Sequence, residues 1–594
     1  MTYHADMQAA AQFLHQGTYK RALKAAQSAA KKSPRSAMAF NVIGIATSSM
    51  GHPKAAIAPF QKALSLQPDF PDAQKNLAQT LILIGRAQAA VALLVTLTDT
   101  TTGTTGGTTP DDWKVWYLKA QGELALGLEA AALTSLDTAR ALAPNTTAIY
   151  HLRSTVFLAL GQIKDAIADL QAVLAITPDD VRALTNLSLP LARQTRSQDA
   201  LDVVQKAVDL APDDIPARYR LATQHVEMGD TAAAILNFSA ILDIQRDNAA
   251  ALEQLATLSP KDDAPALEPR IRSALNKAGK RTEDRASLFF ALSSVLRAND
   301  NTAEAQKMLA RANAEMAAIR PYDPVADTQV TQAILDRFPM PPTITTNPTP
   351  ACTPIFVIGL PRSGTTLVET VLGLHTSVAP LGERGTMGFL LRRIIENDLP
   401  FTAQDAADLV HQDQRLLPDL PAGTTAYVDK MPENYRLVGF LKQAYPNARI
   451  INVRRDPRDI ALSMWTSHFA GSALSYANRW DWMATKFNLY ARSMEHWNRH
   501  LGNQILNIRY EDLVRDVKGI GKHMAAFCEI DWQDKMARPD RATTPILTLS
   551  ATQIRRPVHT GSIGKWRASA DLLAPFIAGL DQALWRTDLD QPPA

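Results

Sequence analysis

The chain has 594 residues, 46% of them hydrophobic, which is enough for two or more domains, each with its own core. Its 62 Lys and Arg residues against 59 Asp and Glu give a net charge of +3, which excludes recognition of nucleic acid by bulk charge. Only Cys352 and Cys528 are present, which excludes a disulfide framework, and the lack of a signal sequence or a long apolar run predicts a cytoplasmic protein with no membrane partner.

The first half of the chain repeats with a period of 34 residues. Prolines recur at this spacing, with one step of 42 residues that contains the Thr- and Gly-rich segment 98–109, which we interpret as a loop insertion. A glycine occupies the same position in six of the repeat units, and Thr195 occupies it in the remaining one. An alanine follows five positions later in every unit. The alanines are Ala22, Ala56, Ala90, Ala132, Ala166, Ala200 and Ala234.

This period resembles the tetratricopeptide repeat, in which each unit is a pair of antiparallel helices. We expect an N-terminal all-α solenoid over residues 1–320, with seven units to about residue 248 and a degenerate part from about 250. Arrays of this kind bind peptides or proteins, so we expect such a partner here. The proline-rich segment 321–352 is interpreted as a linker.

From residue 353 onward, strand-like and helix-like segments alternate, which is typical of a parallel sheet covered by helices. Each candidate strand is followed by a charged or polar cluster, and ligands bind at the carboxyl ends of strands in such sheets. We therefore expect a C-terminal α/β domain, related to P-loop folds, over residues 353–594, with four clusters converging on one site. The candidate strands are 354–358, 426–428, 450–453 and 505–508.

The first cluster is the segment GLPRSGTT at 359–366. A strand, a glycine-containing loop and a helix form a phosphate-binding loop, whose backbone amides and helix N-terminus hold an anion. Nucleoside triphosphatases have a lysine where this chain has Thr365, and that lysine reaches the β and γ phosphates, so its absence argues against a P-loop kinase. Arg362 places a positive charge in the loop, and Thr365 and Thr366 add hydroxyl donors.

Three further clusters follow the other strands. The arginines of RRDPRD at 454–459 suit a second phosphate, with Ser463 two helical turns after Arg455, although a charged turn of Arg–Asp pairs is the alternative. Tyr510 in RYEDL is a candidate nucleotide contact. Lys430 in DKMPEN is weak by itself, since a lysine at a strand end is usually solvated.

Together, GLPRSGTT, VRRDPRDIALSMW and IRYEDLV resemble the sulfotransferase superfamily over about residues 353–570. Members of that family are relatives of nucleotide kinases and use 3′-phosphoadenosine 5′-phosphosulfate (PAPS) as sulfuryl donor, releasing PAP. The resemblance implies that the first loop holds the 5′-phosphosulfate, while Arg455 and Ser463 hold the 3′-phosphate. The loop residues concerned are Pro361, Arg362, Ser363, Gly364, Thr365 and Thr366.

Within the superfamily, the chain is most similar to tyrosylprotein sulfotransferases, which have a Gly-Glu pair after the loop's helix. The resemblance implies Glu383 as the catalytic base, with Arg362 and Lys430 stabilising the transferring group. It also implies that Lys565 and Trp566 contact the donor. No cluster of Cys and His suggests a metal, so we expect none.

Two departures from that family leave the acceptor open. Met431 stands where the family has aspartate, and Gly564 stands where it has a serine, for which Ser562 is a candidate substitute. The favoured acceptor is a protein or peptide tyrosine recruited by the repeat array. A glycan, lipid or small-molecule alcohol is the alternative.

Two further alternatives concern catalysis itself. His375, near the end of the loop's helix, is a rival base, and Glu383 would then pair with a surface arginine. A scaffold protein with an inactive domain is the other alternative, against which the intact loop, Glu383, Lys430 and Arg455 argue.

Overall fold

The computed structural model describes residues 2–98, 112–342, 350–469, 471–542 and 555–589. The chain divides into two compact units, Met1–Ala183 and Leu184–Ala594. The loop insertion expected at 98–109 lies outside the described residues, apart from the last residue of helix α6, and so does the middle of the expected linker. The three-part division drawn from the sequence, at residues 320 and 353, stays a prediction.

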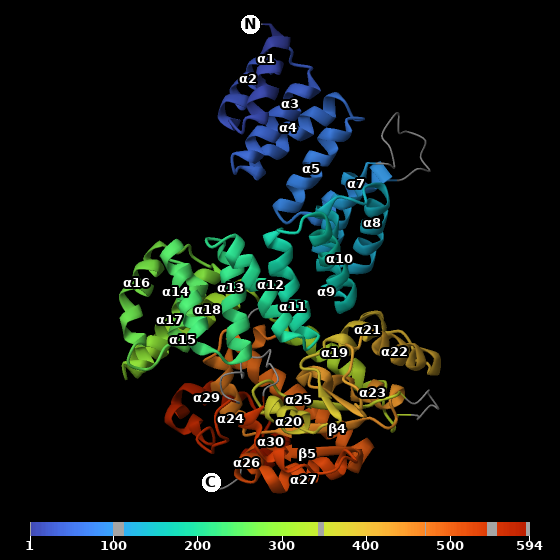
Figure 1. Cartoon of the computed structure of the whole chain (residues 1–594), viewed down its shortest axis with the longest axis vertical. Helices are drawn as coiled ribbons and strands as arrows, with labels where there is room; N and C mark the ends of the chain where they lie inside the picture. Colours follow the sequence, from blue (N-terminus) through green and yellow to red (C-terminus); the bar gives the residue numbers. More distant parts are fainter. Residues whose placement is uncertain (1, 99–111, 343–349, 470, 543–554, 590–594) are drawn as a thin grey trace. The chain divides into compact units, whose positions relative to one another are not determined.

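The first part of the chain forms the seven helical pairs that the repeat predicts (Figure 1). Apart from the pair that begins at Val181, successive helices pack against each other within each pair, and they also pack from one pair to the next inside each compact unit. The pairs are α1 (Tyr3–His15) with α2 (Tyr19–Lys32), α3 (Ala37–Ser49) with α4 (Pro53–Leu66), α5 (Pro71–Leu83) with α6 (Ala87–Thr98), α7 (Trp113–Ala125) with α8 (Glu129–Leu142), α9 (Thr147–Ala159) with α10 (Ile163–Ile176), α11 (Val181–Arg193) with α12 (Ser197–Leu210), and α13 (Ile215–Met228) with α14 (Thr231–Ile244).

The repeat positions found in the sequence have direct structural roles. The glycine of each unit lies in the turn between the paired helices with a left-handed backbone, as at Gly161 with a φ of 70°. Thr195 takes the same conformation with a φ of 60°, although a β-branched side chain is strained there. The alanine five positions later is fully buried in all seven units, because a small side chain allows the helices to approach closely.

The helices after the seven pairs continue the second unit. They are α15 (Ala249–Leu258), α16 (Glu268–Lys277), α17 (Glu283–Ala298), α18 (Thr302–Ile319) and α19 (Pro324–Asp336). The degenerate helical part is therefore present, with α17 and α18 forming a hairpin. Helix α19 lies inside the segment interpreted as a linker: Asp323 caps it, Pro324 occupies its first position, and Asp327 forms ion pairs with two side chains of the C-terminal part.

A five-stranded sheet organises the C-terminal part. The strand order is β2-β3-β1-β4-β5 and every neighbouring pair is parallel. The four strands expected from the sequence are present, and β2, with three residues, was too short to recognise. The strands are β1 (Thr353–Gly359), β2 (Val378–Pro380), β3 (Ala426–Asp429), β4 (Arg449–Arg454) and β5 (Ile505–Arg509).

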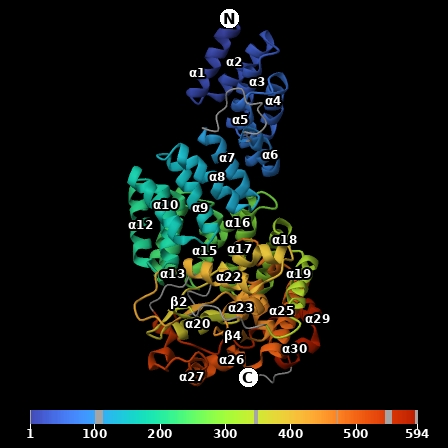
Figure 2. The same ribbon diagram turned by 90° about the vertical axis from the view of Figure 1, so that its right-hand side faces the viewer.

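Helices cover both faces of this sheet (Figure 2). Alternate residues of β1 enter different cores: Ile355 and Val357 pack with α20 (Thr365–Gly373) and α27 (Val517–Phe527), while Phe356 and Ile358 pack with α23 (Val438–Ala444) and α25 (Trp480–Leu501). The helices are α20 (Thr365–Gly373), α21 (Thr386–Glu396), α22 (Ala403–Arg415), α23 (Val438–Ala444), α24 (Pro457–Trp465), α25 (Trp480–Leu501), α26 (Tyr510–Arg515), α27 (Val517–Phe527), α29 (Ala570–Gly579) and α30 (Gln582–Leu589).

One hydrophobic core joins the last repeat helices to the sheet. It runs from Phe238 of α14 through Phe289 of α17 and Met316 of α18 to Phe440 and Trp497 of the C-terminal part. Helices α14 to α18 are therefore integral to the fold of the second unit. None of the helices within the described residues has the length and apolar character needed to span a bilayer.

Candidate active site

The carboxyl ends of the five parallel strands bring together residues that the sequence places far apart. Glu383 follows β2, Lys430 follows β3, the loop with Arg362 follows β1, Arg455 follows β4 and Tyr510 follows β5. Since all neighbouring strands are parallel, these groups lie along one edge of the sheet. The strand-end clusters therefore share one edge of the sheet, as the sequence predicted, while their convergence on one site stays a prediction.

The loop after β1 depends on backbone conformations that only certain residues tolerate. Gly359 has a φ of 151°, and a Cβ atom there would lie 2.7 Å from the carbonyl oxygen of Val453. Gly364 caps α20 with a φ of 106° and lies directly against the ring of Tyr510. Arg362 is also left-handed, with a φ of 71°, which is unusual for a residue with a side chain and costs about 1–3 kcal/mol.

Two arginines concentrate positive charge at this loop. The Arg362 Nε donates a 3.0 Å hydrogen bond to the hydroxyl of Ser463, and Arg455 Nη1 donates a 3.0 Å bond to the carbonyl of Arg362. Burial and the neighbouring Arg455 charge lower the pKa of Arg362 to about 10. A pKa lowered in this way marks a site where a bound anion would be stabilised.

Several polar atoms around the loop have no hydrogen-bond partner in the described chain. The Oγ of Ser363 is fully buried, and neither it nor Arg455 Nε has a hydrogen-bond partner within the described chain. Thr365 and Thr366 are buried at the start of α20, where the first amide groups have no partner within the helix and Gly364 supplies no capping side chain. These donors fit a phosphate or phosphosulfate group.

Tyr510 contributes an aromatic surface at the end of β5. Its ring packs on Gly364, and the guanidinium of Arg455 stacks over it at 4.4 Å from the ring centroid. The arginine is held further by a 2.8 Å bond from its Nη2 to the carbonyl of Ser562. Tyr510 thereby fixes the orientation of Arg455 beside the loop.

Glu383 and Lys430 meet on the neighbouring strand ends. Lys430 Nζ lies 2.6 Å from Glu383 Oε1, and the lysine is fully buried while the glutamate side chain is 48% exposed. Burial raises the pKa of the adjacent Glu369, and the Lys430 charge opposes that rise. The exposed carboxylate of Glu383 is thus anchored by a buried ammonium group.

The Lys565-Trp566 segment reaches the same edge from the C-terminal part of the chain. Asp459 accepts hydrogen bonds from the backbone amides of Gly564, at 2.6 Å, and Trp566, at 3.0 Å. Gly564 has a φ of 69°, which a serine at that position would adopt only with strain. Ser562 lines the cavity and its backbone carbonyl accepts a hydrogen bond from Arg455, and its role as a substitute for the family serine stays a prediction.

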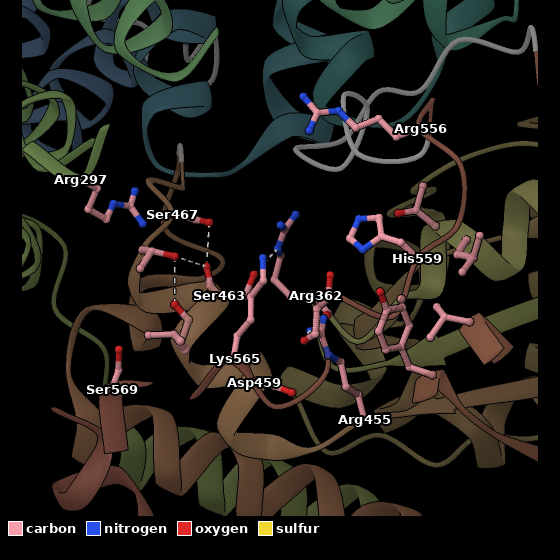
Figure 3. Close-up of a pocket in the computed structure, with 18 of the residues that line it drawn as sticks. Arg297, Arg362, Arg455, Asp459, Ser463, Ser467, Arg556, His559, Lys565 and Ser569 are labelled. Carbon is pink, nitrogen blue, oxygen red and sulfur yellow. Dashed lines mark hydrogen bonds between the residues drawn. The ribbon is translucent and has the colours of Figure 1, made fainter. Parts of the chain in front are cut away.

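A cavity of about 630 Å³ lies over the loop (Figure 3). Its lining includes eight of the predicted site residues: Arg362, Gly364, Thr365, Thr366, Arg455, Ser463, Tyr510 and Lys565. Pro361, Ser363 and Trp566 lie next to lining residues in the chain but do not line the cavity, and Glu383 and Lys430 lie outside it.

His375, the rival base, is held in structural contacts. Its Nδ1 contacts the backbone amide and hydroxyl of Ser377, and its Nε2 contacts the amide of Gln533 at 3.1 Å. Burial lowers the pKa of the imidazole. Both ring nitrogens are therefore engaged where the chain turns between α20 and β2.

Several residues of the cavity lining were missed by the sequence analysis. Ser293 and Arg297 of α17, and Thr302 and Gln306 of α18, face the cavity from helices that carry no motif. Asp459 was also missed as a lining residue, because its only signal was its position in RRDPRD. Across the described residues, no group of three His, Cys, Asp or Glu side chains is arranged to hold a metal ion.

Residues 354–534 match the family model described as the sulfotransferase family, and residues 49–104 and 151–215 match models of the tetratricopeptide repeat. The C-terminal part is a sulfotransferase-family domain. The sulfotransferase domain therefore follows an array of tetratricopeptide repeats in one chain, as the motifs indicated.

The curated relatives of this chain are distant, and the chain spans about a third of the first one's length. An uncharacterized protein of Aquifex aeolicus (strain VF5) is 30% identical over 250 residues, covering 39% of this chain and only 33% of that protein. Sulfotransferase 4A1 of Homo sapiens is 22% identical, covering 36% of this chain and 73% of that protein. Protein-tyrosine sulfotransferase A of Caenorhabditis elegans is 23% identical, covering 38% of this chain and 66% of that protein. A solved tetratricopeptide protein of Thermus thermophilus is 24% identical, covering 32% of this chain and 98% of that chain, with a TM-score of 0.28.

Proposed function

We propose that the sulfotransferase domain transfers a sulfuryl group from PAPS to an acceptor hydroxyl. The observation that carries this proposal is the charge of the cavity lining, which holds four arginines and Lys565 against one carboxylate, Asp459. That carboxylate already accepts two backbone hydrogen bonds. A cavity with this excess of positive charge suits a small ligand with several negative charges.

The residues present fit such a donor. The loop amides, Ser363, Thr365 and Thr366 would hold its 5′-phosphosulfate, while Arg455 and Ser463 would hold its 3′-phosphate. Tyr510 and Lys565 line the same cavity and would contact the nucleotide between them. PAPS, when bound, would supply an activated sulfuryl group on a phosphate leaving group.

We assign the catalytic roles from the charges at the strand ends. Glu383 is half-exposed and would accept the proton of the acceptor hydroxyl as that oxygen attacks. Arg362 and Lys430 are fixed cations on neighbouring strands and would stabilise the negative charge that develops on the transferred group. Both cations would be in position before the acceptor arrives, so little reorganisation would be needed.

We further propose a protein or peptide tyrosine as the acceptor. The repeat array on the same chain supports this choice, because such arrays bind peptides, and so does the likeness to the protein-tyrosine sulfotransferase of C. elegans. The backbone at Gly564, which disfavours the serine of that family, favours a second candidate, a glycan, lipid or small-molecule alcohol. A cytoplasmic location stays a prediction.

Calorimetric titration with PAP and with ATP tests the donor. We expect binding of PAP in preference to ATP, while no binding of PAP, or a preference for ATP, would remove the proposal. The acceptor is then sought by incubating the protein with PAPS and peptides, glycans and small phenols, and measuring the added sulfuryl mass. Transfer to tyrosine peptides is the expected result, and transfer only to glycans or alcohols would favour the second candidate.

A further inference from the structure

One wall of the cavity comes from the helical hairpin α17–α18. Ser293 and Arg297 of α17 line it together with Thr302 and Gln306 of α18. This hairpin lies between the matched family segments, since the repeat matches end at residue 215 and the sulfotransferase match begins at residue 354. Arg297 and Ser467 lie on the same side of the cavity, with Ser463 beside them (Figure 3).

Ser293 and Arg297 have unused hydrogen-bonding capacity. Ser293 is 1% exposed, and its hydroxyl has no hydrogen-bond partner in the described part of the chain. Arg297, one helical turn later, is exposed; it donates a 3.4 Å bond to the hydroxyl of Ser294, and no carboxylate of the described residues lies within ion-pair distance of it. A buried hydroxyl and a guanidinium without an ion-pair partner, one helical turn apart on the same helix, can both donate hydrogen bonds to one bound anion.

The hairpin is fastened to the helix that carries Ser463. Asn313 of α18 donates a 3.0 Å hydrogen bond to the carbonyl of Trp465, the last residue of α24. His468 lies 2.9 Å from a carboxylate oxygen of Glu253 and stacks on Phe290 of α17, with ring centroids 5.0 Å apart. These contacts hold Ser293 and Arg297 in place before any ligand binds, which lowers the entropy lost on binding.

We propose that Ser293 and Arg297 bind the second phosphate of the nucleotide donor, the 3′-phosphate that lies outside the loop. The guanidinium of Arg297 and the hydroxyl of Ser293 donate hydrogen bonds to its oxygens, on the side of the cavity where Ser463 also lies. This inference rests on the proposed function, because it assumes a nucleotide with two anionic groups. Such a nucleotide carries roughly three to four negative charges, more than the loop and Arg455 neutralise.

A consequence is that the repeat-type helices complete the donor site. The array then has a role in binding the donor in addition to any role in recruiting an acceptor. An isolated sulfotransferase segment that begins at residue 353 lacks this wall and the core shared with α14 to α18.

Calorimetric titration with PAP and with adenosine 5′-monophosphate tests the proposal, because the two ligands differ by the 3′-phosphate. We compare the wild type with Arg297→Ala, Ser293→Ala and the control Lys307→Ala, an exposed cation of α18 that does not line the cavity. Arg297→Ala is expected to weaken PAP binding about ten-fold and to leave binding of the monophosphate unchanged. Ser293→Ala is expected to act in the same direction to a smaller extent, and Lys307→Ala to have no effect.

The outcomes separate the two proposals. If the wild type does not bind PAP, the proposed function fails. If the wild type binds PAP and Arg297→Ala binds it equally well, the function stands and the Arg297 subsite is refuted. An equal loss of both ligands would also refute it, because the effect would not depend on the 3′-phosphate. Arg297→Lys, which keeps the charge, is expected to recover part of the PAP affinity and provides a second variant should the alanine protein fold poorly.

Discussion

Lys430 and Glu383 form an ion pair of 2.6 Å between a fully buried ammonium group and a half-exposed carboxylate. The two residues follow β3 and β2, which are neighbours in the sheet, and the backbone amide of Lys430 donates to the carbonyl of Gly382. The pair therefore has a fixed position at the strand edge that also carries the anion-binding loop. Its buried member is fixed by the fold, and its exposed member is accessible to an acceptor.

Replacing Glu383 by glutamine tests the proton acceptor. The amide keeps the size of the side chain but cannot accept a proton, so we expect transfer to fall about 100-fold or more with PAP binding unchanged. Transfer is measured with PAPS and the acceptor found by screening, and PAP binding by calorimetry. Glu396→Gln, an exposed position at the end of α21, serves as the control. Full activity of Glu383→Gln would assign the base to another group.

Replacing Lys430 by methionine separates catalysis from binding. Methionine fills the buried space without the charge, and Glu383 can be solvated because it is half-exposed, so the protein should remain folded. We expect transfer to slow about 100- to 1,000-fold, the range seen when a stabilising donor is removed, with a much smaller change in PAP affinity. A loss confined to PAP affinity would identify Lys430 as a donor-binding residue instead.

The sequence predicted the parts of the site that follow from local patterns. The loop, Arg455 and Tyr510 come directly after strands whose apolar runs are easily recognised, and a parallel sheet must bring such ends to one edge. Strand β2 was missed because three residues are too few for a periodic signal. Ser293 and Arg297 were missed because their place in the cavity depends on packing between α17–α18 and α24, where the contact of Asn313 with Trp465 joins residues 152 positions apart in the chain.

Gly359→Ala tests the backbone requirement of the loop. The added Cβ would lie 2.7 Å from the Val453 carbonyl oxygen on the adjacent strand, and a φ of 151° is unfavourable for alanine. We expect a loss of stability of a few kcal/mol and loss of PAP binding. Gly388→Ala is a matched control, because this glycine is in α21 with nothing within 4 Å of the new Cβ, and alanine there should stabilise the helix by up to about 1 kcal/mol. Urea denaturation measures both changes.

Asp429→Asn tests a buried carboxyl below the site. Arg384 is already paired with Asp413 at 2.8 Å, and Asp429 lies 3.9 Å from the same guanidinium. Burial raises the pKa of Asp429 to about 8. The folded protein then keeps a proton that the unfolded chain releases near pH 4, so Asp429 makes stability fall as the pH rises between about 4 and 8.

Asparagine has the shape of the protonated acid and does not titrate, so this part of the pH dependence should disappear. We expect the urea midpoint of Asp429→Asn to fall less between pH 5 and pH 7.5 than that of the wild type. Asp408→Asn, at an exposed position of α22, should behave as the wild type. Parallel pH profiles for Asp429→Asn and the wild type would show that Asp429 is ionised in the folded protein.

Removing residues 1–179 tests what the first unit contributes. The second compact unit begins near this point and contains the cavity, the sheet and the core shared by α14 to α18, so the shortened protein should fold and bind PAP as the full chain does. If the first repeats recruit a protein acceptor, KM for that acceptor should rise at least several-fold, while KM for a small phenol stays the same. If the shortened protein and the full chain have the same KM for the protein acceptor, recruitment by the first unit is excluded. A loss of PAP binding would show that the second unit needs the first for its structure, because among the described residues none that lines the cavity lies before Ser293.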